Sequence, residues 1–592
     1  MDRKNRPRNG KKAGAGGASA GKGIRYLKER GLKEFSAHAV EKARDSRFDY
    51  GKWIRKERIS SVQAGYQKKL ALSRMPAIYV IIAKEPKNFG EGGDVPEGPA
   101  GDLMEATLLS IRESTYSKVY PVQALNTQIR DEDFLSFVRE GDLIEKNAFF
   151  EMAKALQDGA DAVYSDSDSW METDKGIAYL DPLFKPEFDP DFLRSGNYIG
   201  RLFLVRAGIV RSLCRAKEWE NGLFSGRIPT AERLADPAYC WWLTLGAADI
   251  ASSEGGVRRV PKVLCHIRKE NGPDMDDDAK ERSKKVLEED LARRGYKGII
   301  EEGPLPGTFH VAYAIEGEPL VSIVIPNADH ASVLENCIQS IQRRSTWKNL
   351  EIVVVENNSV RPETFALYRE LQKADKARIV RYPHAFHFSK VINEGVRRAK
   401  GEYVVLMNND VTVRTPDWIE KLLAHVMRPG VGACGPKLLY PDGRVQSAGI
   451  VTGIMGFAGS MMVAERGDDP GYMGRAVLTQ DMSAVTAACM MVQRKAFLKA
   501  GGFPDEFTVA LGDVDFCLSL RDAGYRIVFE PAAVMIHHES LTRGAEDSKE
   551  KKKRFRAEKE RFRKKRVKIL KEGDPAYNPN LSRRRCDWSQ QT

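Results

Sequence analysis

The hydrophobic and polar positions of this chain follow a pattern that occurs twice. Each copy has an apolar run, an apolar run that passes through an acidic turn into a helical pattern, an apolar run with a basic end, and a final apolar run. The first copy has these segments at residues 77–83, 134–156, 198–210 and 257–271. The second copy has them at residues 320–327, 403–426, 487–503 and 525–540. The repeat predicts an internal duplication of a domain of about 220 residues.

Strand-like runs alternate with helical patterns in each copy, which favours an α/β fold with a mainly parallel sheet and helices on both faces. One helix of the second copy is well marked. Thr415 is a candidate cap and Pro416 suits the first turn. A single apolar stripe follows, formed by Trp418, Ile419, Leu422, Leu423 and Val426. The polar residues 408–410 therefore lie in the loop between a buried strand and this helix, at the sheet edge where ligands bind in such folds.

Four polar clusters of the second copy follow strands or begin helices in this way, at residues 353–359, 408–410, 512–527 and 537–538. Asp410 and a histidine of the pair His537 and His538 are ligand types that suit Mn²⁺ or Mg²⁺. Such an ion can neutralise a diphosphate as it leaves. Asp513 and Asp515 are candidates for a general base. Their spacing at a helix start points them apart, so at most one should face the site.

The second copy resembles glycosyltransferase family 2, of the GT-A fold and of the bacterial polysaccharide and O-antigen kind, over roughly residues 320–580. The matching motifs occur in the order VSIVIPN, EIVVVENNS, FHFSKVINEGVRRAKGEYVVLMNND, PKLLYPDGRVQSAG, DDPGYMGR, SAVTAACMMVQR, GDVDFCLSLRDAGYRIVFEP, HHES and DPAYNPNLS. The resemblance implies that the chain consists of two tandem GT-A domains with basic, helical N- and C-terminal extensions.

The resemblance also implies roles for single positions. The nucleotide pocket would be lined by Pro326, Glu356 and Asn358, with Asn393 near the diphosphate. The loop Asn408-Asn409-Asp410 corresponds to the DxD motif of the family and keeps only its last carboxylate. Asp410 would therefore be the main protein ligand of the metal, with His537 as the second ligand and His538 as its substitute.

Asp513 matches the general base of the family's ED motif. The preceding glutamate of that motif is Gly512 here, so the motif is carried by D-V-D and its position alone. The choice between Asp513 and Asp515 therefore stays open.

The first copy keeps the apolar pattern but lacks most of the polar groups. Its metal loop reads FVREGD, with Asp142 as its only carboxylate and Arg139 placing a positive charge nearby. The base position reads PAYCWWLTL, with no aspartate near Tyr239. His266 remains at the final strand. We expect a degenerate domain, and the alternative is an unfamiliar site built from Asp142, His266 and Asp166. We expect Asp166 and Asp168, in YSDSDS, to be loop residues.

The length and hydrophobic content of the chain indicate how it divides into domains. The chain has 592 residues, too many for one core, and 42% are hydrophobic. We expect a disordered basic tail, a helical lead-in, a degenerate GT-A-like domain, a helical connector, a catalytic GT-A domain and a basic helical extension. Their limits are 1–23, 24–75, 76–270, 271–315, 316–545 and 546–592.

Charge and cysteine content bear on location. The formal charge is +12, and residues 549–572 hold fourteen Lys or Arg against four Glu. Such a stretch is a solvated face, a membrane-surface contact or a nucleic-acid patch, and no nucleic-acid-binding motif supports the last. Eight scattered cysteines favour buried thiols in a reducing compartment. No apolar run reaches about 18 residues. We expect a cytoplasmic protein, with peripheral contact to an anionic inner membrane face as a further expectation, and no nucleic-acid partner.

The expected function is transfer of a sugar from a UDP-, dTDP- or GDP-linked donor to a glycan or lipid-linked acceptor in cell-surface polysaccharide synthesis. The family implies a hexosyl- or rhamnosyl-type transfer with inversion. One alternative is a bifunctional enzyme with two active domains. Others are an inactive scaffold of a polysaccharide assembly complex and a nucleic-acid-binding protein led by its basic tails.

Overall fold

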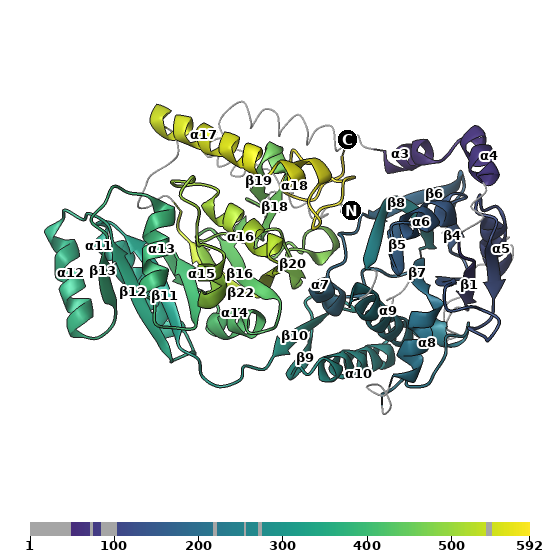
Figure 1. Cartoon of the computed structure of the whole chain (residues 1–592), viewed down its shortest axis with the longest axis horizontal. Helices are drawn as coiled ribbons and strands as arrows, with labels where there is room; N and C mark the ends of the chain where they lie inside the picture. The colour runs from purple at the N-terminus through teal and green to yellow at the C-terminus, as the bar shows by residue number, and fades with distance from the viewer. Residues whose placement is uncertain are drawn as a thin grey trace, which may run out of the picture.

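The computed structural model describes residues 49–70, 75–84, 103–216, 222–253, 256–269, 275–539 and 548–591. Two α/β domains lie side by side along the long axis of the molecule (Figure 1). The predicted tail 1–23 and residues 24–48 of the predicted lead-in lie outside the described residues.

The first domain is built on one mixed sheet. In spatial order its strands are β2 (Val119–Val122), β1 (Ile78–Ala83), β3 (Phe134–Arg139), β7 (Phe203–Arg206), β5 (Ala162–Thr173), β8 (Val257–Arg268) and β4 (Leu143–Ile144), and β6 (Gly176–Leu183) pairs with β5. Strand β7 runs antiparallel to both of its neighbours, and β4 runs antiparallel to β8.

The second domain repeats this order with one more edge strand. Its strands are β13 (Arg378–Arg381), β12 (Leu350–Glu356), β11 (Val321–Asn327), β14 (Tyr403–Met407), β21 (Cys489–Gln493), β16 (Val431–Leu439), β22 (Arg526–His537) and β15 (Val411–Val413), with β17 (Val445–Ser447) and β20 (Gln480–Asp481) at the side. Each pair has the same direction as its counterpart in the first sheet. The predicted α/β class and the tandem repeat are therefore confirmed.

Helices cover both faces of each sheet, as the alternating pattern predicts. In the first domain these are α5 (Leu103–Arg112), α6 (Ala148–Leu156), α7 (Pro190–Ser195), α8 (Ala207–Arg215) and α9 (Pro237–Ser253). In the second domain α11 (Ala331–Arg344), α12 (Pro362–Lys373) and α14 (Trp418–Val426) pack on one face. The other face carries α13 (Phe388–Arg398), α15 (Arg494–Lys499) and α16 (Gly512–Asp522).

The predicted apolar stripe of α14 is buried, but its predicted cap is wrong. The helix begins at Trp418, and Asp417 holds the N-cap position without a side-chain bond. The hydroxyl of Thr415 instead accepts a hydrogen bond from the backbone N–H of Val534, at 3.1 Å. Thr415 therefore ties the start of this segment to β22.

The segment between the domains is helical only in part. It consists of α10 (Asp277–Arg293) and the hairpin β9 (Gly298–Glu302) and β10 (Phe309–Tyr313), which the sequence pattern did not predict. The described part of the lead-in forms α3 (Tyr50–Glu57) and α4 (Ser61–Lys69) against the first domain. No helix among the described residues is long and apolar enough to cross a membrane.

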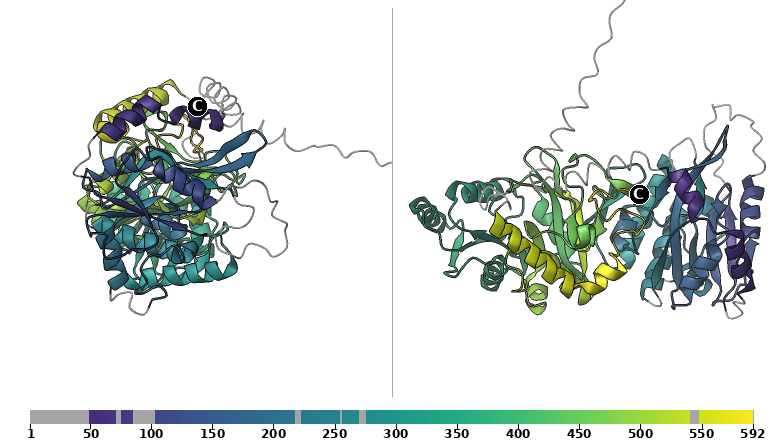
Figure 2. Two further views of the ribbon diagram at one scale, coloured as in Figure 1. Left: turned by 90° about the vertical axis from the view of Figure 1, so that its right-hand side faces the viewer. Right: turned by 90° about the horizontal axis from the view of Figure 1, so that it is seen from above.

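The C-terminal extension belongs to both domains. Helix α17 (Lys549–Lys565) lies along the second domain and is followed by α18 (Val567–Glu572), as Figure 2 shows from above. On α17, the side chain of Phe562 is buried, and buried Glu558 accepts backbone hydrogen bonds from Thr508 and Val509 at 2.7 and 2.9 Å. Beyond α18 the chain reaches the first domain, where Asn578 donates to both oxygens of Asp166 at 2.9 Å.

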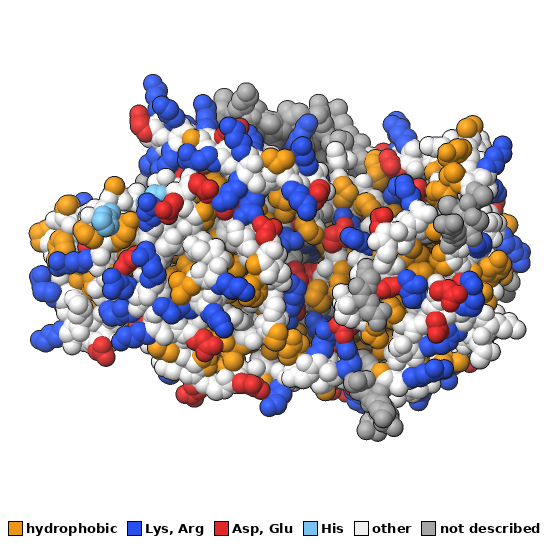
Figure 3. Space-filling model, viewed as in Figure 1, with side chains coloured by type: hydrophobic (Ala, Val, Ile, Leu, Met, Phe, Trp, Pro, Cys, Tyr) orange, Lys and Arg blue, Asp and Glu red, His pale blue; other side chains and the backbone are white. Residues whose placement is uncertain are grey.

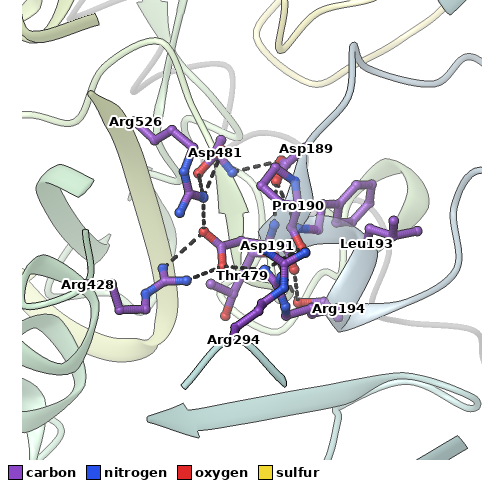
Figure 4. A network of polar contacts seen from close by, with 12 residues as sticks. Asp189, Pro190, Asp191, Leu193, Arg194, Arg294, Arg428, Thr479, Asp481 and Arg526 are labelled. Carbon is purple, nitrogen blue, oxygen red and sulfur yellow. Dashed lines mark hydrogen bonds and ion pairs between the residues drawn. The ribbon is translucent and has the colours of Figure 1, made fainter. Parts of the chain in front are cut away.

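A buried ionic network fixes the two domains against each other (Figure 4). Asp191 of α7 receives two hydrogen bonds from Arg428, at 2.6 and 3.0 Å, and a third from Arg526, at 2.5 Å. Burial raises the pKa of Asp191, but the two guanidinium groups outweigh it and hold this pKa well below its usual range. Charged groups buried in this way are costly to separate, so the interface is a fixed one.

Candidate functional site

The loop of residues 408–410 leaves the sheet directly after β14, which explains its polar side chains. The backbone N–H of Asn408 donates to the carbonyl of Ala488, at 3.0 Å, on the neighbouring β21 side. The amide of buried Asn409 donates to Asn327 at 2.6 Å, at the end of β11. The loop is therefore held at the carboxyl edges of two parallel strands, where the third residue, Asp410, is 6% exposed.

Asp410 and His537 form the central pair of this edge. Residue 411 pairs with His537 across strands β15 and β22, which places Asp410 Oδ1 3.1 Å from His537 Nε2. Asn408 Nδ2 lies 3.4 Å from the same imidazole nitrogen. Adjacent ligands of an octahedral cation are about 3 Å apart when each metal–ligand bond is about 2.1 Å, so this pair fits one divalent ion.

Two observations limit this metal site. No group of three or more His, Cys, Asp or Glu side chains suited to a metal occurs in the described part of the chain. The remaining ligands of an ion would therefore come from water or from a bound phosphate. The Nδ1 atom of His537 is buried without a hydrogen-bond partner. On this side the imidazole therefore lacks the second hydrogen-bond partner that usually orients a metal-binding histidine.

His538 points elsewhere, because successive side chains of a strand point to opposite faces. Its Nε2 lies 3.4 Å from the hydroxyl of Thr412, and its backbone N–H donates to the carbonyl oxygen of Asp410. Of the two histidines, the structure brings His537 to the carboxylate of Asp410.

The two candidate bases are separated by the turn of α16. Asp513 accepts hydrogen bonds from the backbone N–H groups of Ala487, at 3.0 Å, and Val514, at 2.9 Å. Ala487 precedes the residue that binds Asn408, so Asp513 belongs to the same edge as the loop 408–410. Burial raises the pKa of the Asp513 carboxyl, although these N–H groups oppose the shift.

Asp515 faces the opposite way and is committed to the C-terminal extension. Its carboxylate is 1% exposed and forms ion pairs with Arg566, at 2.6 Å, and Lys565, at 3.0 Å. The prediction that the two aspartates point apart is therefore confirmed. The ion pairs of Asp515 and the hydrogen bonds of Glu558, which holds the loop before α16, together fix the helix that carries Asp513.

The predicted nucleotide-binding residues follow the carboxyl ends of β11 and β12. Pro326 is half-buried in β11, and Glu356 at the end of β12 accepts a hydrogen bond from Ser359 N–H at 2.6 Å. Asn358 adopts a left-handed backbone conformation and donates to the carbonyl of His384 at 2.7 Å. The side chain of Asn393 donates to and accepts from the backbone of residue 503, at 2.8 and 2.9 Å. In this structure Asn393 thus clamps a loop.

The residue that sequence reasoning missed is Asn327. It is 4% exposed, accepts the bond from Asn409 and donates to the hydroxyl of Tyr368 at 2.8 Å. A buried amide at the end of an apolar strand was the available signal, because a buried amide must find partners.

The corresponding edge of the first domain has another chemistry. Asp142 precedes β4 as Asp410 precedes β15, and its carboxylate is fully buried in a short ion pair with Arg201. Arg201 comes two residues before β7, so a guanidinium neutralises the carboxylate from the neighbouring strand. Leu143 pairs with His266 as Val411 pairs with His537.

His266 itself is bound to other partners. Its Nδ1 contacts Asp168 at 2.5 Å and its Nε2 contacts Glu145 at 2.9 Å. The hydroxyl of Tyr50, on α3, donates to the second oxygen of Asp168 at 2.7 Å. The lead-in helix therefore contributes a side chain to the edge of the sheet of the first domain.

One expectation about the first domain is wrong. Asp166 and Asp168 are buried residues of strand β5, since Asn578 and His266 supply hydrogen-bond partners that a polar strand residue needs. The alternative site of Asp142, His266 and Asp166 gains no support, because each of these residues is bonded to a different group.

Comparison with known proteins identifies the family of part of the second domain. Residues 322–501 match the model of glycosyl transferase family 2. This segment, which includes Asp410 but ends before Asp513 and His537, is therefore a family 2 glycosyltransferase domain.

The chain is also similar to longer proteins. It is 36% identical to the uncharacterized protein y4gI of Sinorhizobium fredii over 77% of its own length and 49% of that protein. It is 32% identical to the O-antigen biosynthesis protein RfbC of Myxococcus xanthus over 76% of its own length and 34% of that protein. The chain thus spans half or less of these relatives.

A solved mannosyltransferase from Pyrobaculum calidifontis, in complex with GDP-Man and Mn²⁺, is similar with a TM-score of 0.30 and 20% identity. That match covers 38% of this chain and 59% of the mannosyltransferase.

Proposed function

We propose that the second domain transfers a hexosyl or rhamnosyl group from a nucleotide-sugar donor to a glycan or lipid-linked acceptor in cell-surface polysaccharide synthesis. The observation that carries this proposal is the Asp410–His537 pair, which shares one sheet edge with Asp513 in a domain of this family. The similarity to an O-antigen biosynthesis protein supports the polysaccharide role.

The side chains suggest how such a transfer proceeds. Asp410 and His537 would hold Mn²⁺ or Mg²⁺, which neutralises the charge of a departing diphosphate when it is bound. Asp513 takes the proton of the acceptor hydroxyl, and its raised pKa makes it a better proton acceptor than an ordinary exposed carboxylate. Attack opposite the leaving group inverts the anomeric carbon.

A donor panel tests this proposal. The purified protein is incubated with UDP-, dTDP- and GDP-sugars and a lipid-linked acceptor extract, with Mn²⁺, with Mg²⁺ or with EDTA. Release of the nucleoside diphosphate from one donor, dependent on metal and acceptor, is the expected result. No release from any donor under any condition would instead favour an inactive scaffold.

We also propose that the first domain is not a transferase and serves as a platform for the second. The carboxylate of Asp142 is ion-paired with Arg201, and both ring nitrogens of His266 contact carboxylates, of Asp168 and Glu145. Asp142 and His266 are therefore not available to a metal. The buried network of Asp191 with Arg428 and Arg526 supports a fixed docking role.

The exposed face of α17 supports a further proposal, that the protein is cytoplasmic and contacts the anionic inner face of the membrane. Basic side chains recur on this face at helical spacing, away from buried Phe562, and Figure 3 shows them gathered over the helix. They include Lys549, Lys552, Lys553, Arg556 and Lys564. Each basic residue near an anionic surface contributes about 1 kcal/mol. Equal sedimentation with neutral and with anionic liposomes would contradict this contact.

A further inference from the structure

The first domain retains a cavity at the edge that corresponds to the active edge of the second domain. Its volume is about 640 Å³, within the usual range for small-molecule sites. Its wall includes Arg139 at the end of β3, Arg201 before β7, Trp241 near the start of α9 and Arg268 at the end of β8. In chain order and sheet position these elements correspond to β14, β21, α16 and β22, of which β14 leads to Asp410, α16 carries Asp513 and β22 carries His537.

Every charged side chain among the described residues of this wall is basic. The six are Arg139, Lys185, Arg201, Arg268, Lys269 and Lys280. Carboxylates outside the wall pair with Arg201, Lys269 and Lys280, namely Asp142, Asp181 and Asp277. The ammonium group of buried Lys185 donates to the carbonyl of Ile199 at 2.7 Å. A concave wall with one sign of charge concentrates its field on the interior, so the cavity favours an anion.

The guanidinium of Arg201 stands beside the buried carboxylate that corresponds to Asp410. A positive charge is therefore built into the position where the second domain would bind a metal ion. Asp142 offsets the charge of Arg201, but arginines remain charged at any physiological pH and match phosphate geometry, so Arg139, Arg201 and Arg268 together can attract phosphate without a metal.

The rest of the wall is suited to a ring. Phe137, Tyr198 and Trp241 supply aromatic surface, and Ser167 supplies a hydroxyl that is buried without a hydrogen-bond partner. A buried polar atom left unpaired costs free energy, which a bound polar group would recover.

We infer that this cavity binds a phosphate-bearing, ring-containing ligand without a metal ion. The chemistry fits a nucleoside diphosphate or a sugar phosphate of the growing glycan, which share the phosphate and a ring. Binding here does not depend on transfer by the second domain, so the two proposals stand or fall separately.

Calorimetry on the full chain tests the inference. The background variant Asp410→Ala, with EDTA present, disables metal-dependent binding at the second domain. UDP, glucose 1-phosphate and inorganic pyrophosphate are titrated in turn. We expect UDP or glucose 1-phosphate to bind with a Kd below about 1 mM and more tightly than pyrophosphate. Binding by UDP alone identifies the nucleotide, and binding by glucose 1-phosphate alone identifies the glycan phosphate.

Matched charge reversals locate the site. Lys280→Glu and Arg268→Glu, each added to the background variant, should weaken binding at least tenfold. Lys285→Glu, on the exposed face of the same α10, should leave it unchanged, and circular dichroism should show all variants folded. The inference is overturned by the absence of binding of UDP and glucose 1-phosphate, by equal loss in Lys285→Glu, or by pyrophosphate binding as tightly as either.

Discussion

The two domains share one strand order but differ at the edge where the second carries its polar groups. In the second, Asp410 faces His537, with Asp513 on the adjoining helix. In the first, Arg201 covers Asp142, while Asp168 and Glu145 hold His266. The apolar core tolerates this change because strand pairing and side-chain chemistry at a strand end are set by different residues. A duplicated domain can thus keep its scaffold while ion pairs within the protein replace the ligands of a cation.

The largest expected difference in transfer activity is between variants that lack Asp410 in the second domain and variants that lack Asp142 in the first. Asp410→Ala should lower transfer by about 1000-fold or more, since several kcal/mol of charge stabilisation at the leaving group is lost with the metal. Donor turnover and chain folding are measured together. Near wild-type turnover by a folded Asp410→Ala protein in chelator-treated buffer would contradict the role of Asp410 as a metal ligand.

The matched variant in the first domain combines Asp142→Ala with His266→Ala. It should keep the same product, because neither group is proposed to touch substrate. Product analysis by mass spectrometry decides this. If the double variant loses one sugar that the Asp410→Ala protein still adds, the first domain is itself a transferase.

A smaller contrast lies within α16. Asp513→Asn should lower turnover by about 100-fold, the usual scale for a general base, with donor affinity little changed. Asp515→Asn should instead lower the free energy of unfolding by about 2 kcal/mol, because Arg566 and Lys565 lose a charged hydrogen-bond partner while Arg566 keeps its second carboxylate, Asp522. Single-turnover kinetics and chemical unfolding separate the two effects. The opposite assignment follows if Asp515→Asn loses turnover at full stability.

The features that could be predicted from the sequence were local in the chain. Apolar periodicity located the strands, and the polar triplet 408–410 marked a strand end directly. The spacing of Asp513 and Asp515 sufficed to separate their directions. What the sequence could not show depends on partners far along the chain. Arg201 reaches Asp142 across 59 residues, and Asn578 reaches Asp166 across 412.

Asp166 and Asp168 illustrate the physical reason for the wrong assignment. Aspartate is unfavourable in strands, so a local pattern places it in loops. Here distant donors satisfy both carboxylates, and the strand continues through them. Local preferences are overruled where tertiary hydrogen bonds offset the cost of burial.

The smallest expected effect concerns the histidine that the first domain retains. Burial disfavours the imidazolium of His266, but the hydrogen bonds to Asp168 and Glu145 outweigh it and raise the pKa of His266. A raised folded-state pKa stabilises the fold fully below the unfolded value of about 6.5, and this stability is lost as pH rises through the folded value.

His266→Gln should therefore reduce the loss of unfolding free energy as the pH rises above 6.5. A tenfold change in proton affinity on folding corresponds to about 1.4 kcal/mol. Burial also lowers the pKa of His310, but Glu530 and Glu301 outweigh it and raise this pKa to about 9, so the wild-type protein loses stability in this range from both groups. The difference between wild-type and variant unfolding midpoints, measured at pH 6 and at pH 8.5, isolates His266. Equal pH slopes in the two proteins would show that folding leaves the pKa of His266 unchanged, which would contradict a charged pairing of its imidazole with Asp168 and Glu145.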